Sequence, residues 1–130
     1  MVHNSTFFVA IHPLKRNPTR FQKTLAINDW YLSGGSSDTP LGNVQMLGKL
    51  NGPMITNARP RIPVAALNWA TRHSIDMYLT SEDLPSRDNR VTLSRSGQIV
   101  ISWRPNNLAA HRQLRSRTHE ALRGTGYVIQ

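Results

Sequence analysis

The stretch TSEDLPSRDNRVTLSRSGQIVISWRPNNLAAH, residues 80–111, contains the clearest structural pattern in the chain. Apolar and polar residues alternate over Arg90 to Leu93 and again over Gln98 to Trp103, as they do in half-buried strands. Gly97 between the two runs predicts a tight turn, because glycine adopts positive φ angles without steric cost. These residues therefore predict a β-hairpin.

A long helix is expected directly after the hairpin. Asn107 is a favoured N-cap residue, and apolar residues recur at helical spacing from Leu108 onward. Gly124 is a typical residue to follow a helix end. The helix is therefore expected over Leu108 to Arg123.

The segments before the hairpin predict further strands and one short helix. Val64 to His73 carries apolar residues at helical spacing and predicts the helix, whereas three prolines in Asn51 to Pro63 predict a loop. Strands are expected where β-branched and aromatic residues alternate with polar ones, over Thr6 to His12, Phe21 to Ile27, Val44 to Leu47 and Ser74 to Thr80. The three tryptophans fall in predicted structured segments and are expected to face the core: Trp30, Trp69 and Trp103.

These elements predict a single α+β domain over residues 1–130, with a mainly antiparallel sheet, one short helix and one long helix. A chain of 130 residues is long enough for its own core. Hydrophobic residues make up 38% of the chain, below the usual share of about 45–50%. The core is therefore expected to be modest, or part of the apolar surface serves contacts outside this chain.

The residues that most often perform catalysis or bind metals form no recognisable motif. Cysteine is absent, which excludes disulfides, thiol catalysis and cysteine-bound zinc. The five histidines are scattered without metal-ligand spacing, so no metal site is expected. Glu82 and Asp83 are adjacent carboxylates, but neighbours on a strand point to opposite faces. They are expected to cap the turn at Pro85 or to pair with Arg87 or Arg90.

The positive charge permits a polyanionic partner. The chain has 16 Lys and Arg against seven Asp and Glu, a net charge of +9. Arg112, Arg115, His119 and Arg123 share one side of the predicted long helix, as in a phosphate-tracking helix. A solvated helix face with cations near its C-terminus explains the same pattern and is the favoured interpretation. A stand-alone basic module that binds nucleic acid or another polyanion is kept as the alternative function.

No apolar run approaches the roughly 20 residues that a membrane-spanning helix needs, so no membrane span is expected. The first residues, MVHNSTFFVAIHP, lack the basic region and cleavage site of a signal peptide. A cytoplasmic location is the resulting expectation.

Four segments together resemble part of a glucose–methanol–choline (GMC) family oxidoreductase. They lie in order over nearly the whole chain: FQKTLAINDWYL (21–32), PLGNVQMLGKL (40–50), SIDMYLTSEDLPSRDNRVTL (74–93) and WRPNNLAAHRQL (103–114). The resemblance implies the substrate-binding domain of an FAD-dependent enzyme that oxidises the CH–OH group of alcohols or sugars. In such enzymes hydride passes to the flavin and a histidine acts as general base.

The same resemblance indicates what this chain lacks and what it contributes. The family's glycine-rich FAD fingerprint has no match here, and no residue matches its catalytic histidine, so no catalytic residue is assigned. The FAD-binding domain is expected in cis or in trans, with this chain inactive and free of FAD on its own. A non-catalytic subunit that docks onto a separate flavin-binding chain is a further possibility.

Three residues are candidates for the cofactor and substrate sides of such an enzyme. Met1 to Ser5 (MVHNS) is similar to a family segment at the loop near the flavin, which makes His3 and Asn4 candidate cofactor-binding residues. Gln45 is a candidate substrate-binding residue. The alternative for Gln45 is that it satisfies backbone groups beside Gly42 and Gly48.

Overall fold

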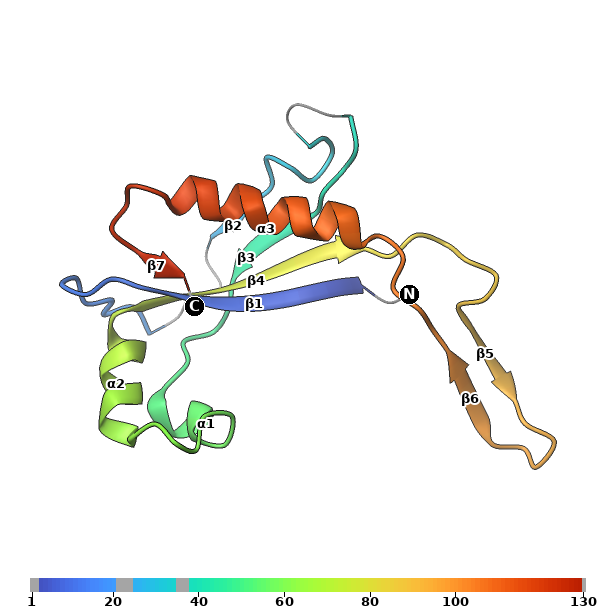
Figure 1. Cartoon of the computed structure of the whole chain (residues 1–130), viewed down its shortest axis with the longest axis horizontal. Helices are drawn as coiled ribbons and strands as arrows, with labels where there is room; N and C mark the ends of the chain where they lie inside the picture. Colours follow the sequence, from blue (N-terminus) through green and yellow to red (C-terminus); the bar gives the residue numbers. More distant parts are fainter. Residues whose placement is uncertain (1–2, 21–24, 35–37, 130) are drawn as a thin grey trace.

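The computed structural model describes residues 3–20, 25–34 and 38–129, which form two antiparallel sheets and three helices (Figure 1). The elements in chain order are β1 (His3–Ile11), β2 (Ala26–Ile27), β3 (Asn43–Met46), α1 (Gly52–Thr56), α2 (Val64–Arg72), β4 (Ser74–Glu82), β5 (Arg90–Leu93), β6 (Ile99–Ser102), α3 (Leu108–Leu122) and β7 (Val128–Ile129). The expected α+β class is confirmed, with the predicted hairpin as β5 and β6 and the predicted long helix as α3.

The larger sheet has the strand order β2-β3-β4-β1-β7, and every neighbouring pair is antiparallel. Its centre is the long β1–β4 pair, which runs without a register shift from His3 opposite Glu82 to Ile11 opposite Ser74. Because successive side chains on a strand point to opposite faces, this register assigns every residue of β1 and β4 to one of two faces.

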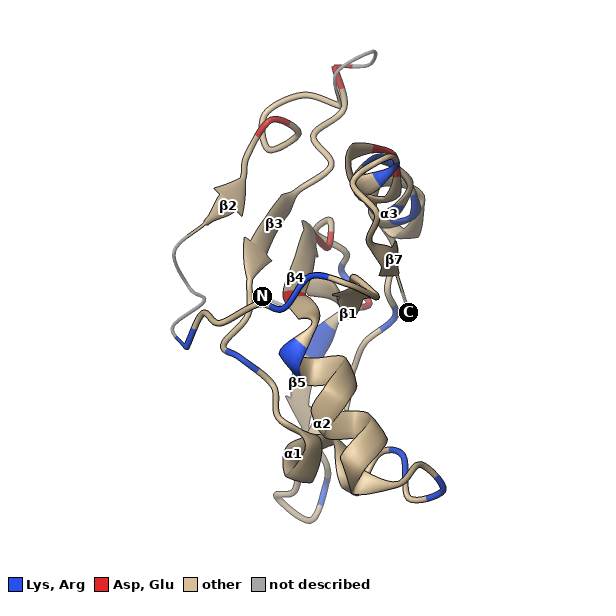
Figure 2. Ribbon diagram, turned by 90° about the vertical axis from the view of Figure 1, so that its left-hand side faces the viewer, with Lys and Arg blue, Asp and Glu red and all other residues tan. Residues whose placement is uncertain are grey.

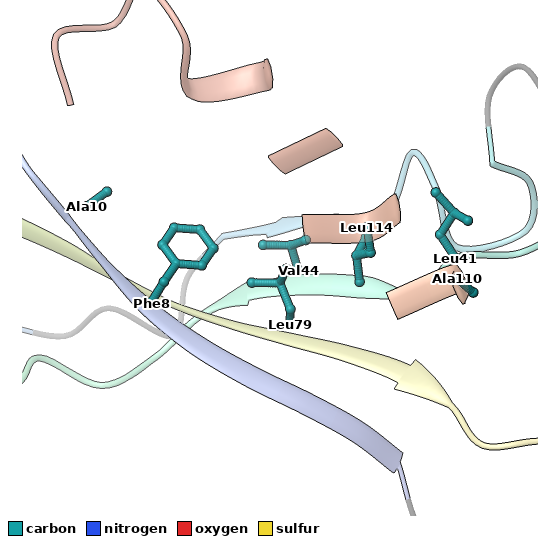
Figure 3. Packing of buried hydrophobic residues seen from close by; sticks show 7 residues of the cluster. All are labelled: Phe8, Ala10, Leu41, Val44, Leu79, Ala110 and Leu114. Carbon is teal, nitrogen blue, oxygen red and sulfur yellow. The ribbon is translucent and has the colours of Figure 1, made fainter. Parts of the chain in front are cut away.

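Helix α3 crosses one face of this sheet, and the core lies between them (Figures 1 and 3). The even-numbered residues of β1 and the odd-numbered residues of β4 point to this face. Phe8 and Leu79 come from these strands, Val44 comes from β3, and Leu114 comes from α3; all four are buried. The predicted helical spacing in α3 thus corresponds to its contact with the sheet.

Two segments differ from the sequence-based expectation. Residues 21–24 of the strand expected over Phe21 to Ile27 lie outside the described residues, and of the remainder only Ala26–Ile27 is strand. The expected loop over Asn51 to Pro63 contains α1, so that prediction was wrong. Proline is tolerated in the first turn of a helix, and the Asn51 side chain accepts the Met54 N–H at its start.

Two of the three tryptophans do not face the core as predicted. Trp69 is 49% exposed and stacks on the His73 ring, with the ring centroids 4.7 Å apart. Trp103 is 41% exposed, and its indole N–H donates to the Asp83 carboxylate over 2.6 Å. Only Trp30 packs against the core, as a half-buried residue. Tryptophan needs a partner for its N–H, which a surface carboxylate supplies as well as a core acceptor does.

Candidate functional site

The face of the large sheet opposite α3 carries exposed side chains from three adjacent strands. Odd-numbered residues of β1 point to it, and His3, Ser5 and Phe7 are all exposed, Phe7 to 63%. This face is called the open face below, after these residues and their cross-strand neighbours on β4 and β3. Its aromatic, hydroxyl and amide groups make it a candidate for contact with a small molecule.

Strand pairing arranges the open face in two rows. Gln45 on β3 lies opposite Tyr78 on β4, and Tyr78 lies opposite Phe7 on β1. The second row, two residues along each strand, is Asn43, Thr80 and Ser5. Cross-strand neighbours have Cβ atoms about 5 Å apart, so the members of a row can contact one ligand together.

The structure separates the three residues suggested by sequence. Gln45 lies in the first row, exposed beside the half-buried Tyr78. His3 lies on the same face, but it is four residues from Phe7 along β1, or about 13 Å. Asn4 points to the opposite face, is buried to 6% exposure, and donates to the Asp83 carboxylate over 3.3 Å. Asn4 therefore links strand ends on the α3 side, away from the open face.

Phe7, Tyr78 and Thr80 are members of the open face that were not predicted from sequence. The alternation in TFFVAIH separates Phe7 from Phe8, but it does not tell which of the two is covered. The β1–β4–β3 register is a long-range property, so the meeting of Phe7, Tyr78 and Gln45 required the fold.

Asp83 ties the end of β4 to the start of α3. Its carboxylate accepts the Asn106 backbone N–H over 2.9 Å in addition to the Trp103 and Asn4 bonds. Hydrogen bonds to the charged form, that from Asn106 foremost, hold the pKa of Asp83 below its ordinary value. The predicted pairing of Glu82 or Asp83 with arginine is not found among the described residues.

The predicted N-cap Asn107 makes no side-chain cap in α3. Its amide instead donates to the Glu82 carbonyl over 2.9 Å. The side chain is therefore used to hold the helix start against β4, because the chain enters α3 directly beside the end of that strand.

His111 is buried between α3 and the sheet, with both ring nitrogens engaged. Nε2 lies 2.7 Å from the Thr6 hydroxyl and Nδ1 lies 3.1 Å from the Ser81 hydroxyl. Burial, and to a smaller extent the charge of Arg115, lower the pKa of His111 below 6.5. The neutral ring suits this position, since it can donate at one nitrogen and accept at the other.

His111 should therefore make the protein less stable in mild acid. Because the folded pKa is lowered, the unfolded state binds more protons, and stability is lost as pH falls from 6.5 toward the folded pKa. The free energy of unfolding, measured by urea titration at several pH values, should show a weaker pH dependence in His111→Gln. The control His3→Gln removes an exposed histidine and should retain the wild-type slope; equal slopes in all three proteins would contradict this role for His111.

The β5–β6 hairpin stands apart from the large sheet and has an uncovered apolar face (Figure 1). Val91 lies opposite Ile101, and Leu93 lies opposite Ile99. Each of these four side chains is more than 65% exposed. A cavity of about 470 Å³ adjoins this face at the base of the hairpin; its lining includes Leu84, Pro85, Val91, Ile101 and Trp103.

An isolated two-stranded hairpin is only marginally stable in water. Gly97 at its turn has the predicted positive φ, 77°. Exposed apolar faces of this kind are common where a protein contacts another molecule.

The basic residues predicted to share one side of α3 are all exposed, and Lys and Arg are prominent along this helix in Figure 2. They are Arg112, Arg115, His119 and Arg123. A fifth basic residue of the helix, Arg117, pairs with Glu120 over 3.4 Å. The helix thus presents a cationic surface on the side of the sheet opposite the open face.

Gly124 and Gly126 are not placed to form a cradle for a flavin pyrophosphate. Gly124 and Gly126 have positive φ angles, but they follow the C-terminal end of α3. The helix dipole is negative at that end and disfavours phosphate, which binds at helix N-termini. The described residues include no group of three or more His, Cys, Asp or Glu that could hold a metal ion. None of the described helices is long and apolar enough to cross a membrane.

Comparison of the chain with protein-family models, with curated proteins and with solved structures finds no match.

Proposed function

We propose that this chain is the substrate-facing part of an FAD-dependent oxidoreductase of the GMC type, which acts on the CH–OH group of alcohols or sugars. The observation that carries the proposal is the first row of the open face, where Phe7, Tyr78 and Gln45 lie side by side on three strands. The segments that resemble the GMC family include two of these three residues, Gln45 and Tyr78.

The open face has the chemistry that such a substrate needs. Aromatic rings pack against a carbon skeleton, while amide and hydroxyl groups can bond its hydroxyls. Phe7 and Tyr78 supply the aromatic rings, and Gln45 and Thr80 supply the hydrogen-bonding groups. FAD, held by another domain, supplies the redox chemistry. The role of this chain is to bind and orient the alcohol and to exclude water from it.

The apolar face of the hairpin is the proposed contact with the FAD-binding domain, in cis or in trans. Val91, Leu93, Ile99 and Ile101 all point to it and are all exposed. Burial of this face against the FAD-binding domain would stabilise the contact by about 25 cal/mol for each Å² of apolar surface removed from water.

Benzyl alcohol and glucose should bind weakly to the open face of the isolated chain. In NMR titrations, resonances of Phe7, Tyr78 and Gln45 should shift with one or both ligands, and Phe7→Ala should weaken binding severalfold because the ring contact is lost. Leu14→Ala is the matched control, since Leu14 is 86% exposed but lies outside the sheet. Shifts confined to other surfaces, or equal loss in both variants, would argue against the site.

The purified chain should be colourless and should oxidise no alcohol by itself, whereas addition of a GMC-type FAD-binding domain should give a complex. Ile101→Lys should abolish that complex, because it places a charge in the apolar face. Thr92→Lys, on the other face of the hairpin, should leave it intact. Size-exclusion chromatography with flavin absorbance measures both, and stoichiometric flavin bound to the chain alone would refute the division of roles.

The exposed cations of α3 support the alternative, a module that binds nucleic acid. If it is correct, binding to duplex DNA should fall steeply between low and moderate salt, and substitution of Arg112, Arg115 and Arg123 by Gln should abolish it. This result would not affect alcohol binding at the open face, so the two functions are separable in one set of proteins.

A further inference from the structure

Helices α1 and α2 and the loop between them form one unit on the side of the large sheet opposite α3 (Figure 1). This unit comprises residues 51–73 and is called the α1–α2 unit below. The start of α1 packs closely on α2, because a Cβ added at the buried Gly52 would overlap the Asn68 side chain. The two helices therefore share one surface.

That surface carries exposed apolar side chains. Leu67 and Thr71 form the buried side of α2. The opposite side of the helix, by its periodicity, carries Ala65, Trp69 and Arg72, which are all exposed. The large apolar side chains of the unit that are at least 42% exposed come from both helices and the loop: Met54, Ile62, Val64 and Trp69.

The same unit carries positive charge and no negative charge. Arg59, Arg61 and Arg72 are exposed. None of the seven acidic residues of the chain lies within residues 51–73, and Figure 2 shows no acidic residue on α1, α2 or the loop between them. By contrast, the cationic helix α3 contains Glu120, and Asp88 directly precedes the apolar hairpin. The α1–α2 unit thus combines exposed apolar groups with cations alone.

Trp69 is held at this surface by a buried neighbour. Its ring stacks on that of His73, with 24° between the ring planes, and the His73 Nδ1 lies 3.1 Å from the His12 carbonyl oxygen. His73 covers one face of the indole and leaves the rest exposed. Among the described residues, the indole N–H has no hydrogen-bond partner. An exposed apolar ring with a free N–H is favoured at a membrane–water interface.

We propose that the α1–α2 unit binds the surface of an anionic lipid membrane, where Trp69 and its apolar neighbours enter the headgroup region and the three arginines contact the anionic headgroups. Segments that lie on a membrane combine tryptophan and aliphatic side chains with Lys and Arg. Anionic lipids attract each basic residue near the surface. The contact is peripheral, because side chains enter the lipid and the helices do not span it.

Nucleic acid fits the same surface less well. Proteins that bind single strands stack bases on exposed aromatic faces, whereas His73 already covers one face of Trp69. Exposed aliphatic side chains such as Met54 and Ile62 gain free energy by leaving water for an apolar medium, which phosphates do not offer. This inference concerns the α1–α2 unit and does not depend on the oxidoreductase proposal.

Sedimentation with vesicles made of equal parts phosphatidylcholine and phosphatidylserine tests the proposal. The full chain should bind these vesicles, and about tenfold more weakly those of phosphatidylcholine alone. Arg61→Gln should weaken binding about fivefold, whereas Arg112→Gln on α3, the matched control, should bind as the wild type does. Trp69→Ala should weaken binding about tenfold, whereas Val91→Ala, which shortens an exposed apolar side chain of the hairpin, should not.

Fluorescence quenching by bromine-labelled lipid tests which part of the protein enters the membrane. The wild-type emission should be quenched on binding. Trp69→Phe should still bind, because an apolar ring is kept, but it should lose most of the quenching, since Trp30 and Trp103 lie outside the α1–α2 unit.

Four outcomes would overturn the proposal. The first is no binding to the mixed vesicles, or equal binding to both kinds of vesicle. The second is equal loss with Arg61→Gln and Arg112→Gln, which would mean diffuse charge attraction. The third is quenching that persists in Trp69→Phe, which would place another surface in the lipid. The fourth is binding to duplex or single-stranded DNA that Trp69→Ala and Arg61→Gln weaken while vesicle binding is unchanged, which would make nucleic acid the occupant.

Discussion

Asp76→Ala should lower the free energy of unfolding by about 3 kcal/mol, the cost of breaking a buried charged network. Asp76 is fully buried at the junction of α2, β4 and the segment after β3. Its carboxylate accepts the Ser74 hydroxyl over 2.7 Å and the Leu50 N–H over 2.9 Å, and it lies 3.7 Å from the Lys49 ammonium. Removing it takes away the acceptor of the Leu50 N–H and the ion-pair partner of Lys49 in the protein interior.

The environment of Lys49 supports this expectation. Burial lowers the pKa of its ammonium, while Asp76 acts in the opposite direction. Among the described residues, the hydrogen bonds that Lys49 would keep without Asp76 are those to Ser74, at 2.7 Å to the carbonyl and 3.0 Å to the hydroxyl.

Urea unfolding measures the effect, with Asp88→Ala as control because Asp88 is exposed and should change stability by less than about 0.5 kcal/mol. A double-mutant cycle with Lys49→Met should give a coupling energy of about 1 kcal/mol or more, since the two groups contact each other. Equal unfolding midpoints for Asp76→Ala and Asp88→Ala would show that the network adds nothing.

Gly42→Ala should destabilise the protein by about 3 kcal/mol, from backbone strain and steric overlap together. Gly42 has a φ of 130°, a conformation that other residues rarely adopt. A Cβ at this position would lie 2.1 Å from the Thr80 carbonyl oxygen, which belongs to the backbone of β4 and is not the flexible end of a side chain. The substitution would therefore force β3 away from β4.

Two other glycines separate strain from overlap. Gly97 has a positive φ of 77° but open space around its Cβ position, so Gly97→Ala should cost only about 1 kcal/mol. Gly48 has neither restriction, and Gly48→Ala should be neutral or slightly stabilising. Equal urea midpoints for the three variants would show that the close approach of Gly42 to Thr80 does not prevent a larger residue at position 42.

Local sequence patterns predicted most elements near the hairpin. The alternation over Arg90 to Leu93 and the helical spacing after Leu108 correspond to β5 and α3. These signals are reliable because they depend only on the periodicity of strand and helix. The chain after Gly124 gave no strand expectation, yet Val128–Ile129 forms β7. Two residues are too few for a pattern, and their strand conformation depends on β1 as a partner.

The candidate site was predictable only in part. Gln45 was named from sequence and lies on the open face, whereas its neighbours Phe7 and Tyr78 were not. Asn4 was named beside His3, but adjacent strand residues point to opposite faces, and Asn4 is buried under α3.

The sequence by itself determined the α+β class, the hairpin turn at Gly97 and the long helix α3, because each follows from periodicity or from glycine's conformational freedom. Only the tertiary structure decided which face of β1 is covered and which is open. Alternation with a period of two assigns the side chains of a strand to two faces, but it does not tell which face is buried. The docking of α3 and the pairing of β1 with β4 buried Phe8 and left Phe7 exposed.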